Sequence, residues 1–320
     1  MAFVKNARKD RNMKKIKTII LTIIIILLVG CTKAEEEKKI NIIATSFPGY
    51  DFARAITKNV EDVNVKMLLK PGAEMHDFEP TPKDIINIEK SDMFIYTGGD
   101  SDKWVEKIIK KINLKKTKII KLMDQVEAKV EEEVEGMEEE IEAEKEYDEH
   151  VWTSPINAIK IIENLEKKIV KLDIKNKEKY ENNKQYYITK LIEIDSKIRN
   201  IVLNSKRKEI IFGDRFPLRY FTDEYNLNYY AAFKGCSEQT EASAKTIAFL
   251  INKVKEDNIP VVFHIELSNK TLAKEISKQT KAKILEFHSA HNISKQDFKK
   301  GTTYIDIMNK NIKVLREALN

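Results

Sequence analysis

The chain has 320 residues, 42% of them hydrophobic, and a formal net charge of +6. This length is enough for about two domains, and the hydrophobic fraction is enough for a buried core. The positive charge comes from residues 1–31, which hold seven basic residues and one acidic residue. The rest of the chain is neutral, with 50 basic (57 minus 7) and 50 acidic (51 minus 1) residues. Because a nucleic-acid partner requires concentrated positive charge, we expect none.

The N-terminus has the pattern of an export signal. A basic stretch, 14–17, precedes an apolar run over 19–29, which is short for a membrane span and has the length of a signal-peptide core. The run ends in L-V-G-C, which resembles the lipobox of bacterial lipoproteins, where the cysteine is lipidated after cleavage. We therefore predict a signal peptide over 1–30 and a lipidated Cys31 with a polar tether over 31–38. An uncleaved N-terminal anchor is the alternative.

Short β-prone segments alternate with helical segments along both halves of the chain. Strands are predicted at 39–46, 63–69, 93–96, 210–212, 228–233, 260–265 and 283–287. Helices are predicted at 47–60, 83–90, 218–224, 243–256, 270–279 and 304–318, and one begins at the N-cap Ser154 followed by Pro155. Such alternation is typical of α/β folds with parallel sheets.

One long helix is predicted between the two halves. The stretch over 174–204 has no Gly or Pro, and Tyr187, Leu191 and Ile194 recur at helical spacing. We therefore predict an α/β fold of two lobes, each a mainly parallel sheet flanked by helices. The lobes would cover 39–173 and 206–320, joined by a helix over 174–205.

The segment 131–149 is strongly acidic. It has twelve acidic residues and one basic residue, Lys145. A block of like charge is typical of a solvated loop. Solubility and the low-affinity gathering of cations near a site are both consistent with it.

Histidine is scarce, so the surroundings of each one are informative. The five are His76, His150, His264, His288 and His291. Imidazole is a common ligand of zinc and neighbouring transition metals. His76 lies in a Pro- and Gly-rich turn after a predicted strand, where open α/β sheets place ligands. His150 precedes a predicted helix, and Asp148 or Glu149 could orient its ring as a supporting acceptor.

Two segments around these histidines resemble a known family. They are H-D-F-E-P-T-P at 76–82 and D-E-H-V-W-T-S-P at 148–155. They resemble the metal-binding lipoproteins of zinc and manganese ABC importers, the solute-binding proteins with one rigid linking helix. The resemblance covers about residues 39–318 and includes Y-T-G-G-D at 96–100. It implies an extracytoplasmic, monomeric binding protein that is not an enzyme and that delivers metal to a permease and its ATPase.

The resemblance also implies a four-coordinate site between the lobes. His76 and His150 would be the two ligands of the first lobe. In the second lobe, Gly213 stands where other members carry a ligand, and Asp214 is a possible substitute.

Two later positions could supply the ligands of the second lobe. Glu266 matches a position where zinc-binding members carry Glu, and His288 matches one where manganese-binding members carry Asp. We therefore predict His76, His150, His288 and Glu266 as ligands and keep His264 and His291 as spares.

Three imidazoles and one carboxylate suit Zn²⁺ as the transported ligand, whereas Mn²⁺ prefers more oxygen ligands and is the alternative. From a different class, an exported zinc hydrolase would keep an open water position on the metal. The sequence has no His-Glu-x-x-His segment to support it. A surface adhesin is a further alternative and is compatible with metal capture.

Overall fold

The computed structural model describes residues 39–73, 78–112, 116–137, 146–235 and 241–320. The predicted signal peptide, Cys31 and the tether lie outside the described residues, and so does His76. None of the helices in the described ranges has the length and apolar character needed to cross a membrane.

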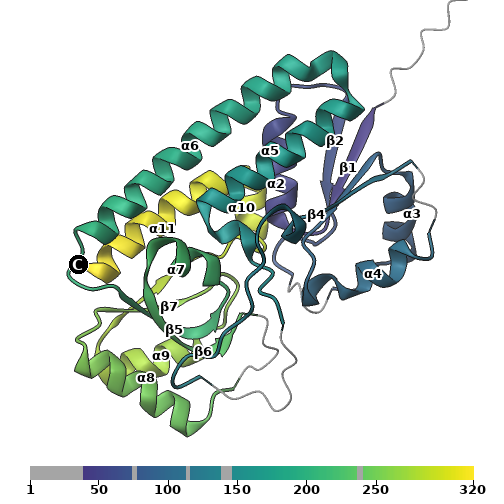
Figure 1. Cartoon of the computed structure of the whole chain (residues 1–320). Helices are drawn as coiled ribbons and strands as arrows, with labels where there is room; N and C mark the ends of the chain where they lie inside the picture. Colours follow the sequence, from purple (N-terminus) through teal and green to yellow (C-terminus); the bar gives the residue numbers. More distant parts are fainter. Residues whose placement is uncertain (1–38, 74–77, 113–115, 138–145, 236–240) are drawn as a thin grey trace, which may run out of the picture. The chain divides into compact units, whose positions relative to one another are not determined.

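The first half of the chain forms a four-stranded parallel sheet (Figure 1). Its strands are β1 (Ile40–Ala44), β2 (Val63–Met67), β3 (Met93–Tyr96) and β4 (Lys118–Lys121), in the order β2-β1-β3-β4. β3 is buried along its whole length, as expected for a central strand covered on both faces. The flanking helices are α2 (Phe47–Ile56), α3 (Pro82–Lys90), α4 (Lys103–Ile109) and α5 (Pro155–Leu172). α2 and α5 share a core cluster on one face, and α3 and α4 share one on the other.

The second half repeats this arrangement. Its strands are β5 (Glu209–Phe216), β6 (Asn228–Lys234), β7 (Val261–His264) and β8 (Lys283–Glu286), all parallel, in the order β6-β5-β7-β8. The flanking helices are α7 (Arg219–Tyr225), α8 (Ala244–Glu256), α9 (Thr271–Thr280), α10 (Lys295–Lys300) and α11 (Tyr304–Leu319). The α/β prediction with two mainly parallel sheets is therefore confirmed.

The long helix α6 (Lys177–Leu203) contacts both halves. Its 27 residues span about 40 Å. Near its beginning, Asn183 donates to the backbone oxygen of Ile56 at 2.9 Å. Near its end, Asp195 pairs with the Tyr225 hydroxyl of α7 at 3.0 Å. The helix predicted between the lobes is thus present, and it runs along both of them (Figure 1).

A buried carboxylate joins the two halves at α2. Asp51 accepts hydrogen bonds from the Tyr187 hydroxyl of α6 at 2.7 Å and from the backbone N–H of Tyr304 at 2.9 Å. It also forms an ion pair with Arg54 at 2.5 Å. Tyr304 begins α11 of the second half, so the halves are held together by polar contacts as well as by a shared core.

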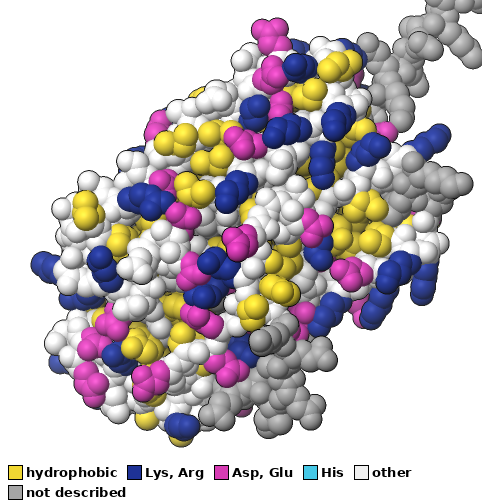
Figure 2. Space-filling view, in the orientation of Figure 1, with side chains coloured by type: hydrophobic (Ala, Val, Ile, Leu, Met, Phe, Trp, Pro, Cys, Tyr) yellow, Lys and Arg dark blue, Asp and Glu magenta, His cyan; other side chains and the backbone are white. Residues whose placement is uncertain are grey.

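The described part of the acidic segment differs from a freely solvated loop. Glu132 forms an ion pair with Arg219 at 2.8 Å, and Glu133 forms one with Lys234 at 2.7 Å. Gly136 lies so close to the ring of Phe249 that a Cβ would stand 2.0 Å from it. These contacts attach the beginning of the segment to the second half. On the face in Figure 2, acidic and basic side chains are interspersed, in line with the neutral charge of the chain beyond residue 31.

Candidate metal centre

His150 is held by the residue two positions before it. Its backbone N–H and its Nδ1 both lie within hydrogen-bond distance of Asp148 Oδ1, at 2.7 and 2.9 Å. Donation from Nδ1 leaves the Nε2 lone pair available for a metal. Burial acts to lower the pKa of His150, but the Asp148 carboxylate outweighs it, so the pKa lies above its ordinary value. The Asp148 carboxylate therefore orients both the backbone and the ring of His150.

Glu149 occupies a fully buried position beside His150. Its carboxylate accepts from the backbone N–H of Ser101 at 3.0 Å and from the Ser101 hydroxyl. Burial raises the pKa of Glu149 to about 7, although His150 and Ser101 act in the opposite direction. Gly99 makes this placement possible, because a Cβ at Gly99 would stand 2.5 Å from Glu149 Oε2. The second glycine of the Y-T-G-G-D segment thus provides space for the carboxylate.

His291 approaches from the second half, in the loop after β8. Its Nε2 lies 3.6 Å from Glu149 Oε1, and its ring meets that of His150 edge to face at 5.0 Å between centroids. Its backbone N–H donates to Glu266 Oε1 at 3.1 Å, and its backbone oxygen accepts from Phe47 of α2 at 3.3 Å. The ring is thus placed between the two halves.

Glu149, His150 and His291 bring one donor atom each to within 4.8 Å of one another. Among the described residues they are the only group of this kind. The cavity beside them has a volume of about 30 Å³ and is lined by both histidines. This volume accommodates an ion or a water molecule and is too small for an organic solute.

His76 lies outside the described residues, but the chain leading to it is placed at the same cavity. Ala73 lines the cavity. The Asn292 side chain donates to the backbone oxygens of Lys70 and Ala73, at 3.1 and 2.5 Å. The segment preceding His76 is therefore bonded to the loop that carries His291.

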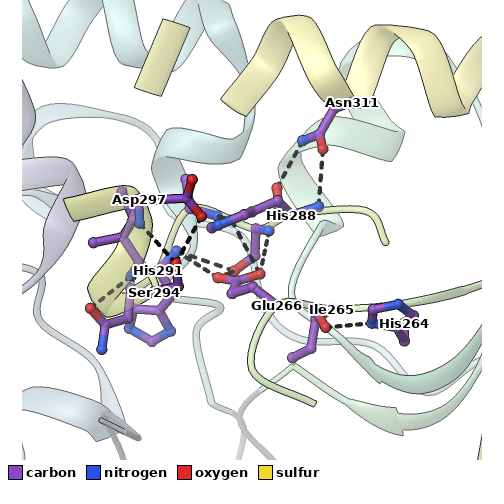
Figure 3. Close-up of polar contacts among 12 residues, drawn as sticks. His264, Ile265, Glu266, His288, His291, Ser294, Asp297 and Asn311 are labelled. Carbon is purple, nitrogen blue, oxygen red and sulfur yellow. Dashed lines mark hydrogen bonds and ion pairs between the residues drawn. The ribbon is translucent and has the colours of Figure 1, made fainter. Parts of the chain in front are cut away.

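Glu266 and His288 lie together near this group, but their side chains are engaged in other hydrogen bonds (Figure 3). The Glu266 carboxylate accepts from the Ser289 N–H at 2.7 Å and the Ser289 hydroxyl at 2.6 Å, in addition to the His291 N–H. His288 Nδ1 accepts from the Ala290 N–H at 2.9 Å and lies 3.4 Å from Glu266 Oε2. Burial acts to raise the pKa of Glu266, but His288 and the Ser289 donors lower it below its ordinary value. Glu266 thus organises the loop that presents His291.

Asp214 and His264, the remaining candidates, bond to backbone groups and are not part of this group. The Asp214 carboxylate accepts from the backbone N–H groups of Arg215 at 2.9 Å and Ile265 at 3.3 Å. Gly213 has no room for a side chain, because a Cβ there would lie 2.7 Å from the Ala273 backbone of α9. His264 is buried with its Nδ1 at 2.7 Å from the Ile265 oxygen, apart from the other histidines (Figure 3). The departure from the family at Gly213 therefore reflects close packing of α9 on β5.

The sequence favours His288 over His291, whereas the geometry favours His291. Both histidines lie in one loop, three residues apart. Ala290 between them has φ of +63°, a left-handed conformation that is uncommon for a residue with a side chain. This turn directs the second histidine toward His150. Hydrogen bonds to Glu266, which is distant in the sequence, support this turn. Local sequence spacing could therefore identify the loop that carries both histidines, but not which of the two is directed toward His150.

Comparison with known proteins gives one family. The family model described as "Zinc-uptake complex component A periplasmic" matches residues 42–318. The high-affinity zinc uptake system protein ZnuA of Bacillus subtilis is 34% identical over 284 residues, 88% of each chain. The zinc-binding lipoprotein AdcA of Streptococcus pneumoniae is 30% identical over 96% of this chain, which spans only 61% of that longer protein.

Solved structures agree in fold and in sequence. The metal-dependent lipoprotein YcdH of Bacillus subtilis has a TM-score of 0.74 and 31% identity, covering 88% of this chain and 99% of the other. The Zn(II)-bound ZnuA-like domain of Streptococcus pneumoniae AdcA has a TM-score of 0.72 and 29% identity, with the same coverage. The chain belongs to the ZnuA family of zinc-binding solute-binding proteins of ABC importers.

Proposed function

We propose that the chain captures Zn²⁺ outside the cell with Glu149, His150 and His291, together with His76, and delivers it to an ABC importer. The observation that carries this proposal is the meeting of three donor atoms from both halves within 4.8 Å. The family is one of solute-binding proteins for zinc uptake and not of enzymes, which argues against the hydrolase alternative.

The proposed ligand set has the chemistry predicted from the sequence but partly different members. It comprises three imidazoles and one carboxylate, a combination that suits tetrahedral Zn²⁺ better than Mn²⁺. In this set, His291 and Glu149 replace His288 and Glu266, which we predicted from the sequence. The grouping of donor atoms from Glu149, His150 and His291 within 4.8 Å supports this exchange, and so does the Ala290 N–H that donates to His288 Nδ1.

The partners follow from the family. Solute-binding proteins of this kind work with the permease and ATPase of an ABC importer. We further propose that Cys31 carries a lipid that anchors a monomer on the outer side of the membrane. The L-V-G-C sequence supports the anchor, and relatives named lipoproteins agree with it. Laminin-binding proteins of known structure are only 20% identical and share the fold alone, so an adhesin role gains no support from them.

The ligand assignment can be tested by zinc titration of the metal-free chain from residue 32 onward. We expect one tightly bound zinc per chain and a loss of affinity of at least about a hundredfold in His150→Ala and His291→Ala, because each removes a ligand. His76→Ala should behave in the same way. His288→Asn is the matched control, since it removes an imidazole from the same loop as His291.

Two outcomes would contradict the proposal. If His288→Asn releases zinc and His291→Ala retains it, the ligand set predicted from the sequence is the correct one. If His150→Ala retains zinc at full affinity, the site is elsewhere. X-ray absorption of the zinc-loaded chain should show four ligands from the protein, and an additional water ligand with only three from the protein would revive the hydrolase.

A further inference from the structure

The acidic segment leaves and returns to the site through a short antiparallel hairpin stem, residues 129–131 paired with 146–148. The Asp148 N–H donates to the Lys129 oxygen at 2.9 Å, and the Glu131 N–H donates to the Glu146 oxygen at 2.9 Å. Val130 and Tyr147 form the bridge between these bonds. In a regular antiparallel ladder, every second pair of opposed residues exchanges two hydrogen bonds. Lys129 and Asp148 form one of theirs directly.

The second bond of that pair passes through a side chain of the other half. The Lys129 N–H donates to the Tyr220 hydroxyl at 2.9 Å, and this hydroxyl donates to the Asp148 oxygen at 2.9 Å. Tyr220 lies in α7 and is 2% exposed, and burial raises its pKa above the ordinary value. The Tyr220 hydroxyl therefore takes the place of the direct hydrogen bond from the Lys129 N–H to the Asp148 oxygen.

Further contacts hold the stem against α7. The Lys129 ammonium pairs with Asp223 at 2.7 Å, and Arg219 pairs with Glu132 at 2.8 Å. All four side chains of these two ion pairs are partly exposed, so each pair contributes little to stability. The Tyr220 hydroxyl is buried, and it contacts both strands of the stem at the residue pair nearest the site.

We propose that Tyr220 is a positioning residue for the zinc site, acting through Asp148 on His150. This inference rests on the proposed function. The Asp148 backbone is held by Tyr220, and the Asp148 carboxylate holds both the backbone and the ring of His150. Tyr220 of the second half thereby helps to set the position of His150, which belongs to the first half.

The consequence of removing the hydroxyl follows from hydrogen-bond satisfaction. Without it, the Lys129 N–H and the Asp148 oxygen either stay buried without a partner or bond directly. If they bond directly, the Lys129 nitrogen and the Asp148 oxygen, which the Tyr220 hydroxyl now bridges, move to within one hydrogen-bond length of each other. Direct bonding displaces Asp148, and loss of the partner leaves its backbone less firmly held. In both cases the orientation of the His150 ring is weakened. Zinc should then dissociate faster, because a supporting acceptor that fixes the ligand geometry strengthens metal binding.

The test compares Tyr220→Phe with Tyr225→Phe in the chain from residue 32 onward. Tyr225 is a matched control because it is also buried, lies in the same helix and bonds through its hydroxyl to Asp195 of α6. Zinc dissociation is followed by stopped-flow transfer to a chelator. We expect about tenfold faster dissociation in Tyr220→Phe, the equivalent of one lost hydrogen bond. Tyr225→Phe should change the rate less than twofold, although both variants lose stability toward urea.

A double-mutant cycle with Asp148→Ala separates positioning from general stability. If Tyr220 acts through the Asp148 carboxylate, Tyr220→Phe should have little further effect on zinc dissociation in Asp148→Ala, provided that urea unfolding shows that variant folded. Additive effects, or equal rates for Tyr220→Phe and Tyr225→Phe, would overturn the inference. Loss of zinc in His150→Ala with an unchanged Tyr220→Phe would leave the proposed function intact. Tight zinc binding in His150→Ala would instead refute the proposed function itself.

Discussion

The indole Nε1 of Trp152 donates a hydrogen bond to the backbone oxygen of Ser289 at 2.8 Å. Trp152 follows His150 by two residues, and Ser289 precedes His291 by two. The Trp152 and His291 rings also pack against each other, with 5.3 Å between centroids. Because the two segments come from different halves of the chain, this bond helps to fix the separation of the two histidines.

Replacing Trp152 with Phe should weaken zinc binding by about tenfold, since the aromatic body remains while the bond to Ser289 is lost. Competition with a chromogenic chelator measures this affinity. Trp104→Phe is the control, because Trp104 Nε1 is buried and has no hydrogen-bond partner among the described residues. Equal losses in the two variants would show that the bond between the segments is unimportant for the site.

Zinc affinity and the stability of the metal-free chain should respond to pH in opposite directions. Burial raises the pKa of Glu149 from 4.5 to about 7, so the folded chain retains a proton there that the unfolded chain has released. The contribution of Glu149 to the free energy of unfolding is therefore highest below pH 4.5. It declines by about 3 kcal/mol as pH rises through 7. Zinc competes with the same proton, so its affinity should rise with pH through 7.

The measurements are urea unfolding of the metal-free chain at pH 5 and 8 and zinc competition at pH 6 and 8, each repeated on Glu149→Gln. Burial also raises the pKa of Asp102, to about 6. Asp102 therefore contributes a stability change of the same sign in the unsubstituted chain and in Glu149→Gln. The difference between the two proteins is therefore due to Glu149. If both proteins lose equal stability between pH 5 and 8, Glu149 is not protonated in the folded state.

Much of the fold can be predicted from local pattern. Buried strands alternating with helices give two parallel sheets, and Ser154 caps α5 as predicted, accepting from the Asn157 N–H at 3.2 Å. β4 escapes prediction because it is a four-residue edge strand with Lys at both ends, half of it exposed. Lysine on an edge strand opposes pairing with other chains and at the same time hides the apolar pattern of a strand.

The site is only partly predictable, for a different reason. His150 and Asp148 are two residues apart, so their hydrogen bond is a local feature that the sequence contains. The choice between His288 and His291 depends on Glu266 and on Asn311 of α11, which bonds to both the N–H and the oxygen of His288 at 3.0 and 2.8 Å. Contacts between residues more than twenty positions apart decide which ring faces the cavity, and no local spacing encodes them.

Gly213→Ala should destabilise the fold without removing zinc. The new Cβ would meet the Ala273 backbone at 2.7 Å, and α9 would have to move away from β5. Overpacking of this kind typically costs about 1–3 kcal/mol. Urea unfolding measures the cost, and zinc stoichiometry should remain one per chain. Gly301→Ala is an informative comparison, because no atom lies near its Cβ position and only the positive φ of +73° opposes the change. An equal or smaller cost for Gly213→Ala would contradict close packing as the reason for glycine.

Glu266→Gln should weaken zinc binding without changing the number of ligands. A glutamine offers one acceptor oxygen in place of two, so the three donors from Ser289 and His291 can no longer all be satisfied. We expect a ten- to hundredfold loss of affinity, the range seen when residues that orient a ligand are changed. X-ray absorption of the zinc-loaded variant should still show one oxygen and three nitrogen ligands. In Glu149→Gln the spectrum should lose the carboxylate oxygen, because there the substituted side chain is itself a proposed ligand. A Glu266→Gln spectrum lacking that oxygen, together with an unchanged Glu149→Gln spectrum, would make Glu266 the ligand and Glu149 the supporting residue.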